Sequence, residues 1–91
     1  MHLLVSYDLR NDRRRNRLAK GLSGFLTRVQ MSVFEGELPD QRLEDLLSQN
    51  DSQIDASEDT VRIYRLCRRC VTALEIKGQG LAIGPEGDEI V

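Results

Sequence analysis

Residues 2–22 have the sequence HLLVSYDLRNDRRRNRLAKGL, in which a short apolar segment passes directly into a strongly basic one. Residues 2–7 predict a buried strand, because the segment is apolar, contains Val and Tyr, and ends at a polar run that starts with Asp8. Asn11 or Asp12 can cap a helix that follows and that ends by about residue 26. On this helix an apolar stripe lies opposite basic side chains: Leu18, Leu22, Phe25 and Leu26 face away from Arg13, Arg17 and Lys20.

The rest of the chain continues the alternation of strands and helices. Residues 28–38 are β-rich and predict one kinked strand or two short ones, with Gly36 as the place for a bulge or bend. A second helix is predicted from Pro39 and Asp40, because leucines follow at helical spacing. The remaining predicted elements are a polar loop over 50–59, strands over 60–66 and 71–76, and a glycine-rich tail from about residue 78.

This order of elements predicts an α+β fold, a ferredoxin-like βαββαβ sandwich in which two helices cover one face of an antiparallel sheet. No helix is left for the other face, which is therefore either solvated or packed against a second copy of the chain. The short strand of the tail is a candidate for addition to a partner's sheet edge. We find no repeat and no second domain, so residues 1–91 predict a single domain with about 78–91 as its tail.

Composition excludes several classes of protein. No apolar stretch approaches the ~20 residues of a membrane span, and the N-terminus lacks a secretory signal, so we expect a cytoplasmic protein without membrane contact. The net charge of −2 conceals a segregation of charge. Residues 1–30 carry seven basic and two acidic side chains, whereas residues 31–60 carry one basic and nine acidic ones. Because polyanion binding depends on local potential, the basic third of the chain can hold phosphates.

Asp8 is the main candidate for chemistry. It lies where an apolar strand gives way to a polar turn, so a rigid backbone would hold a carboxylate suited to Mg²⁺ together with phosphate and water. Six Lys and Arg residues follow between positions 10 and 20, and those in the first helical turns oppose the helix dipole. Asp8 can equally be a turn or capping residue, and the arginines a solvated helix face. One carboxylate is too few for a two-metal site, but a homodimer could bring two copies of Asp8 to its two-fold axis.

Cys67 and Cys70 form a lone CxxC motif. A zinc site needs four ligands, and the one histidine, His2, is distant in the sequence. A thioredoxin-type motif should open a helix, whereas the residues after Cys70 predict a strand, so structural, reduced thiols are expected. The arginines around the motif are either a second phosphate-binding cluster or scattered solvated charges: Arg62, Arg65, Arg68 and Arg69.

Taken together, these segments resemble a known family, the CRISPR-associated protein 2 family, which is the small endoribonuclease-like partner of the integrase in spacer acquisition. The resemblance covers nearly the whole chain and includes the strand ending in Tyr7-Asp8 and the basic helix RRRNRLAKGL. It also includes RVQMSVFEG at 28–36 and VRIY at 61–64. One departure is that Leu26 stands where the family usually has glycine.

The resemblance implies a homodimer packed through the sheets, with C-terminal strands that reach the partner. It also implies metal-dependent cleavage of single-stranded RNA or duplex DNA. Asp8 would be the catalytic residue and, with its symmetry mate, the ligand of Mg²⁺ or of Mn²⁺. The nucleic-acid-binding candidates are Arg13, Arg14, Arg15, Arg17, Lys20 and Arg28, with Tyr7 and Phe34 near the site.

Two functions follow as hypotheses for this role in CRISPR adaptation. The first is a Mg²⁺-dependent phosphodiesterase centred on Asp8, for which the sequence offers no general base. The second is a non-catalytic scaffold that binds duplex DNA by its backbone and docks the integrase, and this function does not need Asp8. We favour the scaffold role in the cell, with nuclease activity as a further property. A redox or regulatory module built on the CxxC motif is a third, weaker hypothesis.

Overall fold

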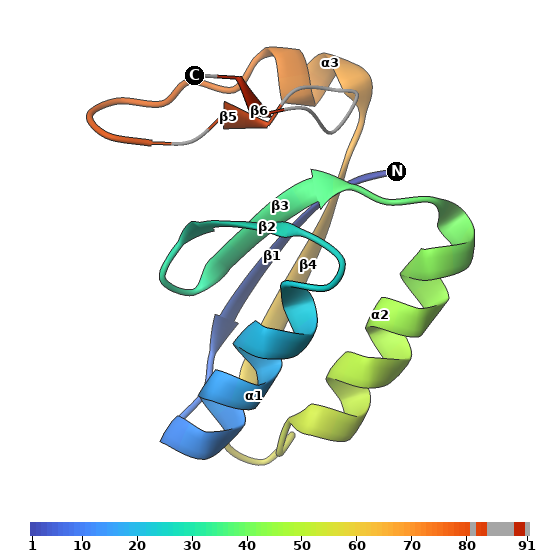
Figure 1. Cartoon of the computed structure of the whole chain (residues 1–91), viewed down its shortest axis with the longest axis vertical. Helices are drawn as coiled ribbons and strands as arrows, with labels where there is room; N and C mark the ends of the chain where they lie inside the picture. The colour runs from blue at the N-terminus through green and yellow to red at the C-terminus, as the bar shows by residue number, and fades with distance from the viewer. Residues whose placement is uncertain (81, 84–88, 91) are drawn as a thin grey trace.

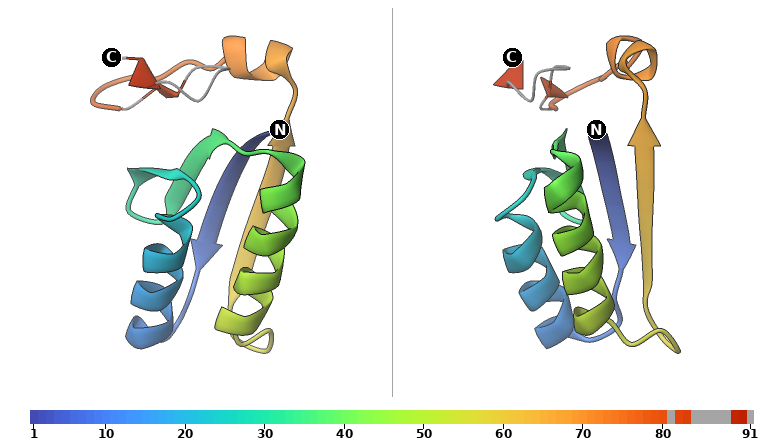
Figure 2. Two further views of the ribbon diagram at one scale, coloured as in Figure 1. Left: turned by 45° about the vertical axis from the view of Figure 1, so that its right-hand side comes forward. Right: turned by 90° about the vertical axis from the view of Figure 1, so that its right-hand side faces the viewer.

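Four antiparallel strands form one sheet with the order β2-β3-β1-β4, and two helices cover one of its faces (Figures 1 and 2). The computed structural model describes residues 1–80, 82, 83, 89 and 90. This arrangement confirms the predicted α+β, ferredoxin-like fold. The six elements of the sandwich are β1 (His2–Asp8), α1 (Asp12–Leu22), β2 (Thr27–Gln30), β3 (Val33–Glu37), α2 (Asp40–Gln53) and β4 (Thr60–Leu66).

The central strand β1 separates the two faces of the sheet. It pairs with β3 on one side and with β4 on the other, so its backbone is bonded along both edges. Successive side chains of a strand point to opposite faces. Leu3, Val5 and Tyr7 therefore point toward the helices and are buried, whereas the even-numbered side chains from His2 to Asp8 face the side that no helix covers.

The core lies between the sheet and the two helices. Phe34 of β3, Leu18 of α1 and Leu46 of α2 are completely buried in it. Gly36 of β3 is buried on the same face, and a Cβ atom at this position would lie 3.3 Å from the Cδ2 atom of Leu26. The missing side chain of Gly36 thus leaves room for Leu26 in the turn after α1.

The structure refines the sequence-based boundaries in the first half of the chain. Of the two alternatives for residues 28–38, two short strands are confirmed, whereas the bulge or bend proposed at Gly36 is wrong, because the irregularity of register lies between Arg28 and Gln30. Helix α1 ends at Leu22. A turn follows, in which the N–H groups of Phe25 and Leu26 donate to the Leu22 carbonyl. Helix α2 continues to Gln53, into the stretch predicted as loop.

The second half of the chain differs more from the sequence-based prediction. The strand predicted over 71–76 is wrong, because a short helix, α3 (Arg68–Thr72), begins directly after β4. The Cys67 sulfur accepts a hydrogen bond from the N–H group of Cys70, and Val71 is buried beneath the turn. This local cap favours a helical turn over the β preference of Val71 and Thr72.

The tail forms a small hairpin of its own. Strands β5 (Ala82–Ile83) and β6 (Glu89–Ile90) pair with each other, while residues 81, 84–88 and 91 lie outside the described part of the chain. The tail leaves the sheet through α3, at the end opposite to Asp8 (Figure 1). Among the described residues, no helix has the length and apolar character needed to cross a membrane.

We predict that Leu46→Ala lowers the free energy of unfolding by about 2–5 kcal/mol, because it removes a fully buried side chain from between α2 and the sheet. Met31→Ala is the matched control, since the Met31 side chain is 85% exposed, and should change stability by less than about 0.5 kcal/mol. Urea unfolding followed by circular dichroism measures both. Equal losses for the two variants would contradict this location of the core.

Candidate nucleic-acid and metal site

Asp8 is an exposed carboxylate at the end of the central strand. Its backbone pairs with Thr60 of β4, and its side chain lies on the face that α1 and α2 do not cover. The Asp8 side chain forms no hydrogen bond or ion pair with another described residue. A carboxylate that is held by a paired strand and has no internal partner is free to bind an external cation or a hydrogen-bond donor.

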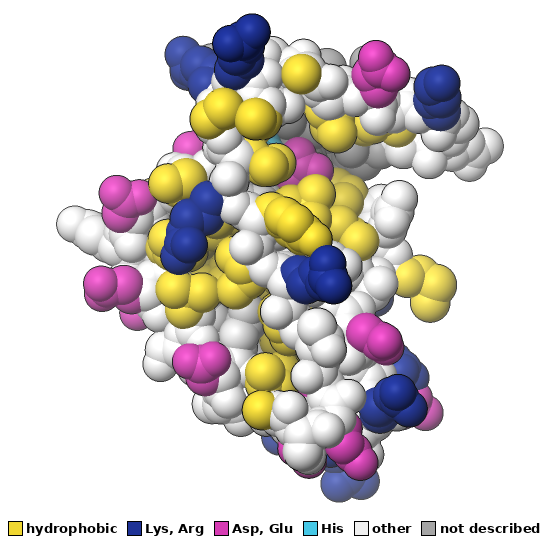
Figure 3. All heavy atoms as spheres, turned by 180° about the vertical axis from the view of Figure 1, so that it is seen from behind, with side chains coloured by type: hydrophobic (Ala, Val, Ile, Leu, Met, Phe, Trp, Pro, Cys, Tyr) yellow, Lys and Arg dark blue, Asp and Glu magenta, His cyan; other side chains and the backbone are white. Residues whose placement is uncertain are grey.

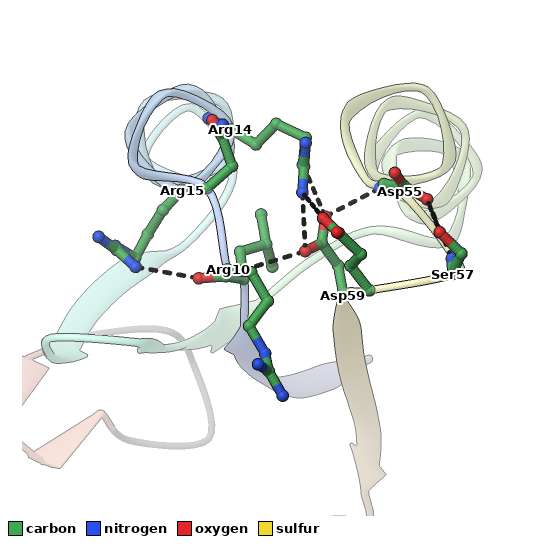
Figure 4. A network of polar contacts seen from close by, with 9 residues as sticks. Arg10, Arg14, Arg15, Asp55, Ser57 and Asp59 are labelled. Carbon is green, nitrogen blue, oxygen red and sulfur yellow. Dashed lines mark hydrogen bonds and ion pairs between the residues drawn. The ribbon is translucent and has the colours of Figure 1, made fainter.

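The loop after Asp8 is fixed by a second carboxylate, that of Asp59 (Figure 4). Leu9 anchors the loop in the core. The N–H group of Arg10 donates to Asp59 Oδ1 at 3.2 Å, and the N–H group of Asp55 donates to Oδ2 at 2.9 Å. Arg14 Nε donates to the same Oδ2 at 2.8 Å. Asp59, directly before β4, therefore ties together the β1–α1 loop, the start of the α2–β4 loop and the first turn of α1.

These contacts change the acidity of Asp59. The hydrogen bond from the Arg14 guanidinium, helped by the donated N–H group of Asp55, lowers the pKa of Asp59 to about 2. The pKa of Arg14 is raised by the same partner. Sequence analysis did not single out Asp59, because its partners Arg10 and Arg14 are 49 and 45 residues away along the chain.

The basic residues proposed from the sequence fall into two groups. Arg14 and Arg15 hold the loop: Arg14 pairs with Asp59 and Glu58, and Arg15 donates to the Leu9 carbonyl at 2.9 Å and pairs with Asp12. The other group is exposed on α1 and has no hydrogen bond or ion pair with other described residues. It consists of Arg13, Arg17 and Lys20.

Arg28 lies apart from these residues on the edge strand β2, and β3 separates it from β1. Its guanidinium donates to the Met31 carbonyl and lies over the Phe34 ring, 5.6 Å from the ring centroid. Phe34 and Tyr7 stack with ring centroids 6.3 Å apart, and both are buried on the helix side of the sheet. Tyr7 directly precedes Asp8 and Phe34 is opposite Val5 of β1, but both rings point to the face opposite to the Asp8 side chain.

Arg62 joins Asp8 on the uncovered face. It is opposite Ser6, whereas Asp8 is opposite Thr60, so the two residues are diagonal neighbours in the antiparallel pair. Such neighbours lie about 7–8 Å apart, within reach of an arginine side chain. Arg62 is exposed and donates to the hydroxyl of Tyr64 at 3.3 Å. The sequence placed Arg62 only in a loose basic cluster; the strand register is what relates it to Asp8.

The uncovered face also holds a pocket of about 490 Å³. Its lining includes Leu4, Val33 and Tyr64 of the sheet and, from the segment after α3, residues 74–77, 79 and 80. Figure 3 shows hydrophobic side chains gathered on this face, with Lys and Arg side chains among them. The face that the sequence left as solvated or covered by a second copy is thus partly covered by the chain's own tail.

His2 and Glu35 form a buried polar pair near the end of the sheet from which the tail leaves. His2 Nε2 and Glu35 Oε2 are 2.8 Å apart, and both side chains are almost completely buried. Removal of either partner would leave the other buried without its main contact. Sequence analysis considered His2 only as a distant zinc ligand, because the contact with Glu35 exists only once β1 and β3 pair.

The described residues of one chain do not complete a metal site. They contain no group of three or more His, Cys, Asp or Glu side chains arranged to hold an ion. The oxygen donor of Asp8 fits a hard cation such as Mg²⁺ or Mn²⁺, which takes one or two carboxylates together with phosphate oxygens and water. Asp8 therefore fits Mg²⁺ or Mn²⁺ as one ligand of a site, and further ligands must complete that site.

A small ferredoxin-like sheet with an open carboxylate at the end of β1 and a basic helix directly after it defines a class of compact proteins suited to phosphate ligands. The sequence profile of the family described as CRISPR associated protein Cas2 matches residues 1–73. The chain belongs to this Cas2 family.

Comparisons with individual relatives agree with this family assignment. The chain is 40% identical over 81 residues to the CRISPR-associated endoribonuclease Cas2 3 of Chloroflexus aurantiacus, with 89% of this chain and 87% of that protein covered. It is 37% identical over 87 residues to the CRISPR-associated endoribonuclease Cas2 of Thermus thermophilus, with 96% and 86% covered. The crystal structure of Streptococcus pyogenes Cas2 at pH 6.5 superimposes with a TM-score of 0.76 at 29% identity, over 86% of this chain and 100% of that one.

We predict that Asp59→Asn lowers the melting temperature at neutral pH, because the Arg14 guanidinium loses its charged partner and the loop after Asp8 loses an anchor. The carboxylate of Asp59 has a pKa of about 2 in the folded chain, below the value of ~3.9 expected when unfolded. Its stabilising effect is therefore complete above about pH 4 and is lost as the pH falls toward 2.

Melting temperatures of the wild type and Asp59→Asn, measured between pH 2 and pH 7, test this prediction. Asp45→Asn on the exposed surface of α2 is the control and should follow the wild type throughout. A difference between wild type and Asp59→Asn that stays constant down to pH 2 would contradict the role of the charged carboxylate.

Proposed function

We propose that this chain acts in CRISPR adaptation as a dimeric nucleic-acid-binding scaffold with metal-dependent endonuclease activity at Asp8. The observation that carries the proposal is the placement of Asp8 as an exposed, internally unpaired carboxylate at a fixed strand end, directly before a run of arginines. The relatives are named endoribonucleases, which supports RNA as a substrate. Duplex DNA is the second candidate substrate.

The dimer is proposed from the uncovered sheet face. Leu4, Val33 and Tyr64 lie on it as incompletely buried apolar side chains, and a chain of this size gains much from further burial. A two-fold axis over this face would bring Asp8 of one protomer toward Asp8 of its partner. Mutual repulsion would then disfavour two charged carboxylates unless a cation lay between them.

Mg²⁺, or Mn²⁺ in its place, is the proposed cation. When bound, it would polarise a phosphodiester and lower the pKa of a bound water. The chain's own part is to keep the Asp8 oxygen atoms at a fixed position on a paired strand and to leave them exposed. Arg62, a diagonal neighbour on the same face, is placed to bind a phosphate oxygen beside Asp8.

Nucleic acid is proposed to bind through its backbone. The exposed cations of α1 carry this contact, because Arg13, Arg17 and Lys20 are the predicted binding residues of this helix without an internal acceptor in the described structure. Arg14 and Arg15 would act indirectly by fixing the loop. Arg28 would extend the surface along β2. Such contacts recognise charge rather than sequence.

The proposed cellular role is to hold duplex DNA beside the CRISPR integrase in the cytoplasm, as the family resemblance implies. A purely structural, non-catalytic adaptor is the second candidate. Neither candidate requires a three-ligand metal cluster within one chain, and the described residues contain none. The two candidates differ in a single requirement, which is that only the nuclease needs Asp8.

We predict that Asp8→Ala lowers the rate of cleavage of single-stranded RNA by at least about 100-fold, because it removes the proposed metal ligand. Binding of the uncleaved substrate should change little, since Asp8 contributes no positive charge. Cleavage of labelled RNA and duplex DNA with Mg²⁺, Mn²⁺ or EDTA measures the first effect, and fluorescence anisotropy in EDTA measures the second.

Asp45→Ala on α2 is the control and should cleave at the wild-type rate. Cleavage that persists in Asp8→Ala, or in EDTA, would contradict a metal nuclease at Asp8. Binding without cleavage by the wild type under every condition would support the adaptor instead.

The backbone-binding surface makes a separate prediction. Binding to duplex DNA should weaken steeply with salt, and replacing Arg13, Arg17 and Lys20 by alanine should reduce the slope of log K against log [salt] by about 2–3. Arg42→Ala, an exposed position on α2, is the control and should leave the slope unchanged. Affinity for duplex DNA, measured at salt concentrations from about 50 to about 200 mM, tests this prediction. An unchanged slope in the triple variant would exclude α1 as the binding surface.

A further inference from the structure

Cys67 and Cys70 lie at the junction between β4 and α3, at the end of the sheet opposite to Asp8. The sequence argued against a redox motif here because the residues after Cys70 predict a strand. The structure removes this objection, since the motif follows a strand and begins a helix, with Cys67 as the cap and Cys70 in the first turn. The two thiols are not explained by the proposed function.

The geometry brings the two sulfur atoms together. Cys67 Sγ and Cys70 Sγ are 3.3 Å apart, and both residues are exposed. A disulfide bond is about 2.05 Å long, so a small rotation of the side chains is enough to form one. Because both side chains are exposed, they add little to the core, which weakens the expectation of purely structural thiols.

We propose that Cys67 and Cys70 are a redox modification site, a dithiol that is oxidised to an intramolecular disulfide by low-molecular-weight disulfides, with Cys67 as the attacking thiol. Three features of the junction support the assignment: the short distance between the sulfur atoms, their exposure to solvent, and the position of Cys67 as acceptor of the Cys70 N–H group at 3.4 Å.

The acidities of the two thiols differ in the direction that this order of attack requires. The hydrogen bond from the N–H group of Cys70 lowers the pKa of the Cys67 thiol, because it stabilises the thiolate. The interaction with the Cys67 sulfur raises the pKa of the Cys70 thiol. Cys67 is therefore the better nucleophile at neutral pH, and Cys70 is the resolving thiol.

The reaction balances as two exchange steps. The Cys67 thiolate attacks one sulfur of the external disulfide RSSR, which forms a mixed disulfide and releases one RS⁻. Cys70 then loses its proton and attacks the Cys67 sulfur, which forms the Cys67–Cys70 bond and releases the second RS⁻. The protein loses two electrons and two protons, that is, two hydrogen atoms, and the oxidant takes them up as it is reduced to two thiols.

The bond would join the cap of α3 to its first turn. Helix α3 connects β4 to the tail, and Val71 is its one buried residue. Residues 74–77, 79 and 80, which follow α3, line the pocket on the uncovered sheet face. Oxidation would therefore fix the point from which the tail leaves the sheet.

Reaction of the reduced, full-length protein with oxidised glutathione, followed by mass spectrometry under native conditions, tests the proposal. The wild type should lose two hydrogen atoms per chain and remain free of adducts, and dithiothreitol should reverse the change. Cys70→Ser should stop at the mixed disulfide, with glutathione on Cys67. Cys67→Ser should react at least about tenfold more slowly than Cys70→Ser, because the thiol with the lowered pKa is gone.

Circular dichroism of the two variants checks that each is folded, and both substitutions are at exposed positions. Stable glutathione adducts on both cysteines of the wild type would overturn the proposal, because the thiols would not have closed on each other. Disulfides between chains as the main product, or equal rates for the two serine variants, would overturn it as well.

Discussion

The alternation of side chains along β1 is the constraint on which the structure depends. Leu3, Val5 and Tyr7 fill the core, and the strand is hydrogen-bonded along both edges, so its register cannot shift independently. A slip by one residue would move the apolar set to the uncovered face and would carry the Asp8 carboxylate into the core. The exposure of Asp8 is thus fixed by the burial of its odd-numbered neighbours.

The charged residues near Asp8 divide into structural and available groups. Arg14 and Arg15 belong to the arginine run, yet their guanidinium groups hold the loop through Asp59, Glu58 and the Leu9 carbonyl. The exposed cations of α1 remain available for phosphate. A run of basic residues in a sequence therefore serves two purposes here: one part positions the loop beside Asp8, and the other presents positive charge.

Local patterns predicted the elements whose side chains repeat regularly. The short apolar run of β1 and the helical spacing of apolar residues in α1 and α2 predicted those elements, and their order predicted the α+β fold. The boundary at α3 could not be predicted in this way, because the cap formed by Cys67 outweighs the β preference of Val71 and Thr72.

Asp8 could be identified from the sequence because a strand end and a basic helix adjoin it directly. Asp59 and Arg62 could not be related to it, since their relation depends on how β4 pairs with β1. The same holds for the buried pair of His2 and Glu35, which only the pairing of β1 with β3 creates. Long-range register is the information that local sequence patterns lack.

The most direct test of a shared metal site is the stoichiometry of Mn²⁺ binding, measured by electron paramagnetic resonance in the presence of a cleavage-resistant phosphorothioate RNA. If Asp8 of two protomers holds a single cation, the wild type should bind one ion per two chains, and Asp8→Ala should lose this binding. One ion per chain, or binding unaffected by Asp8→Ala, would contradict the shared site.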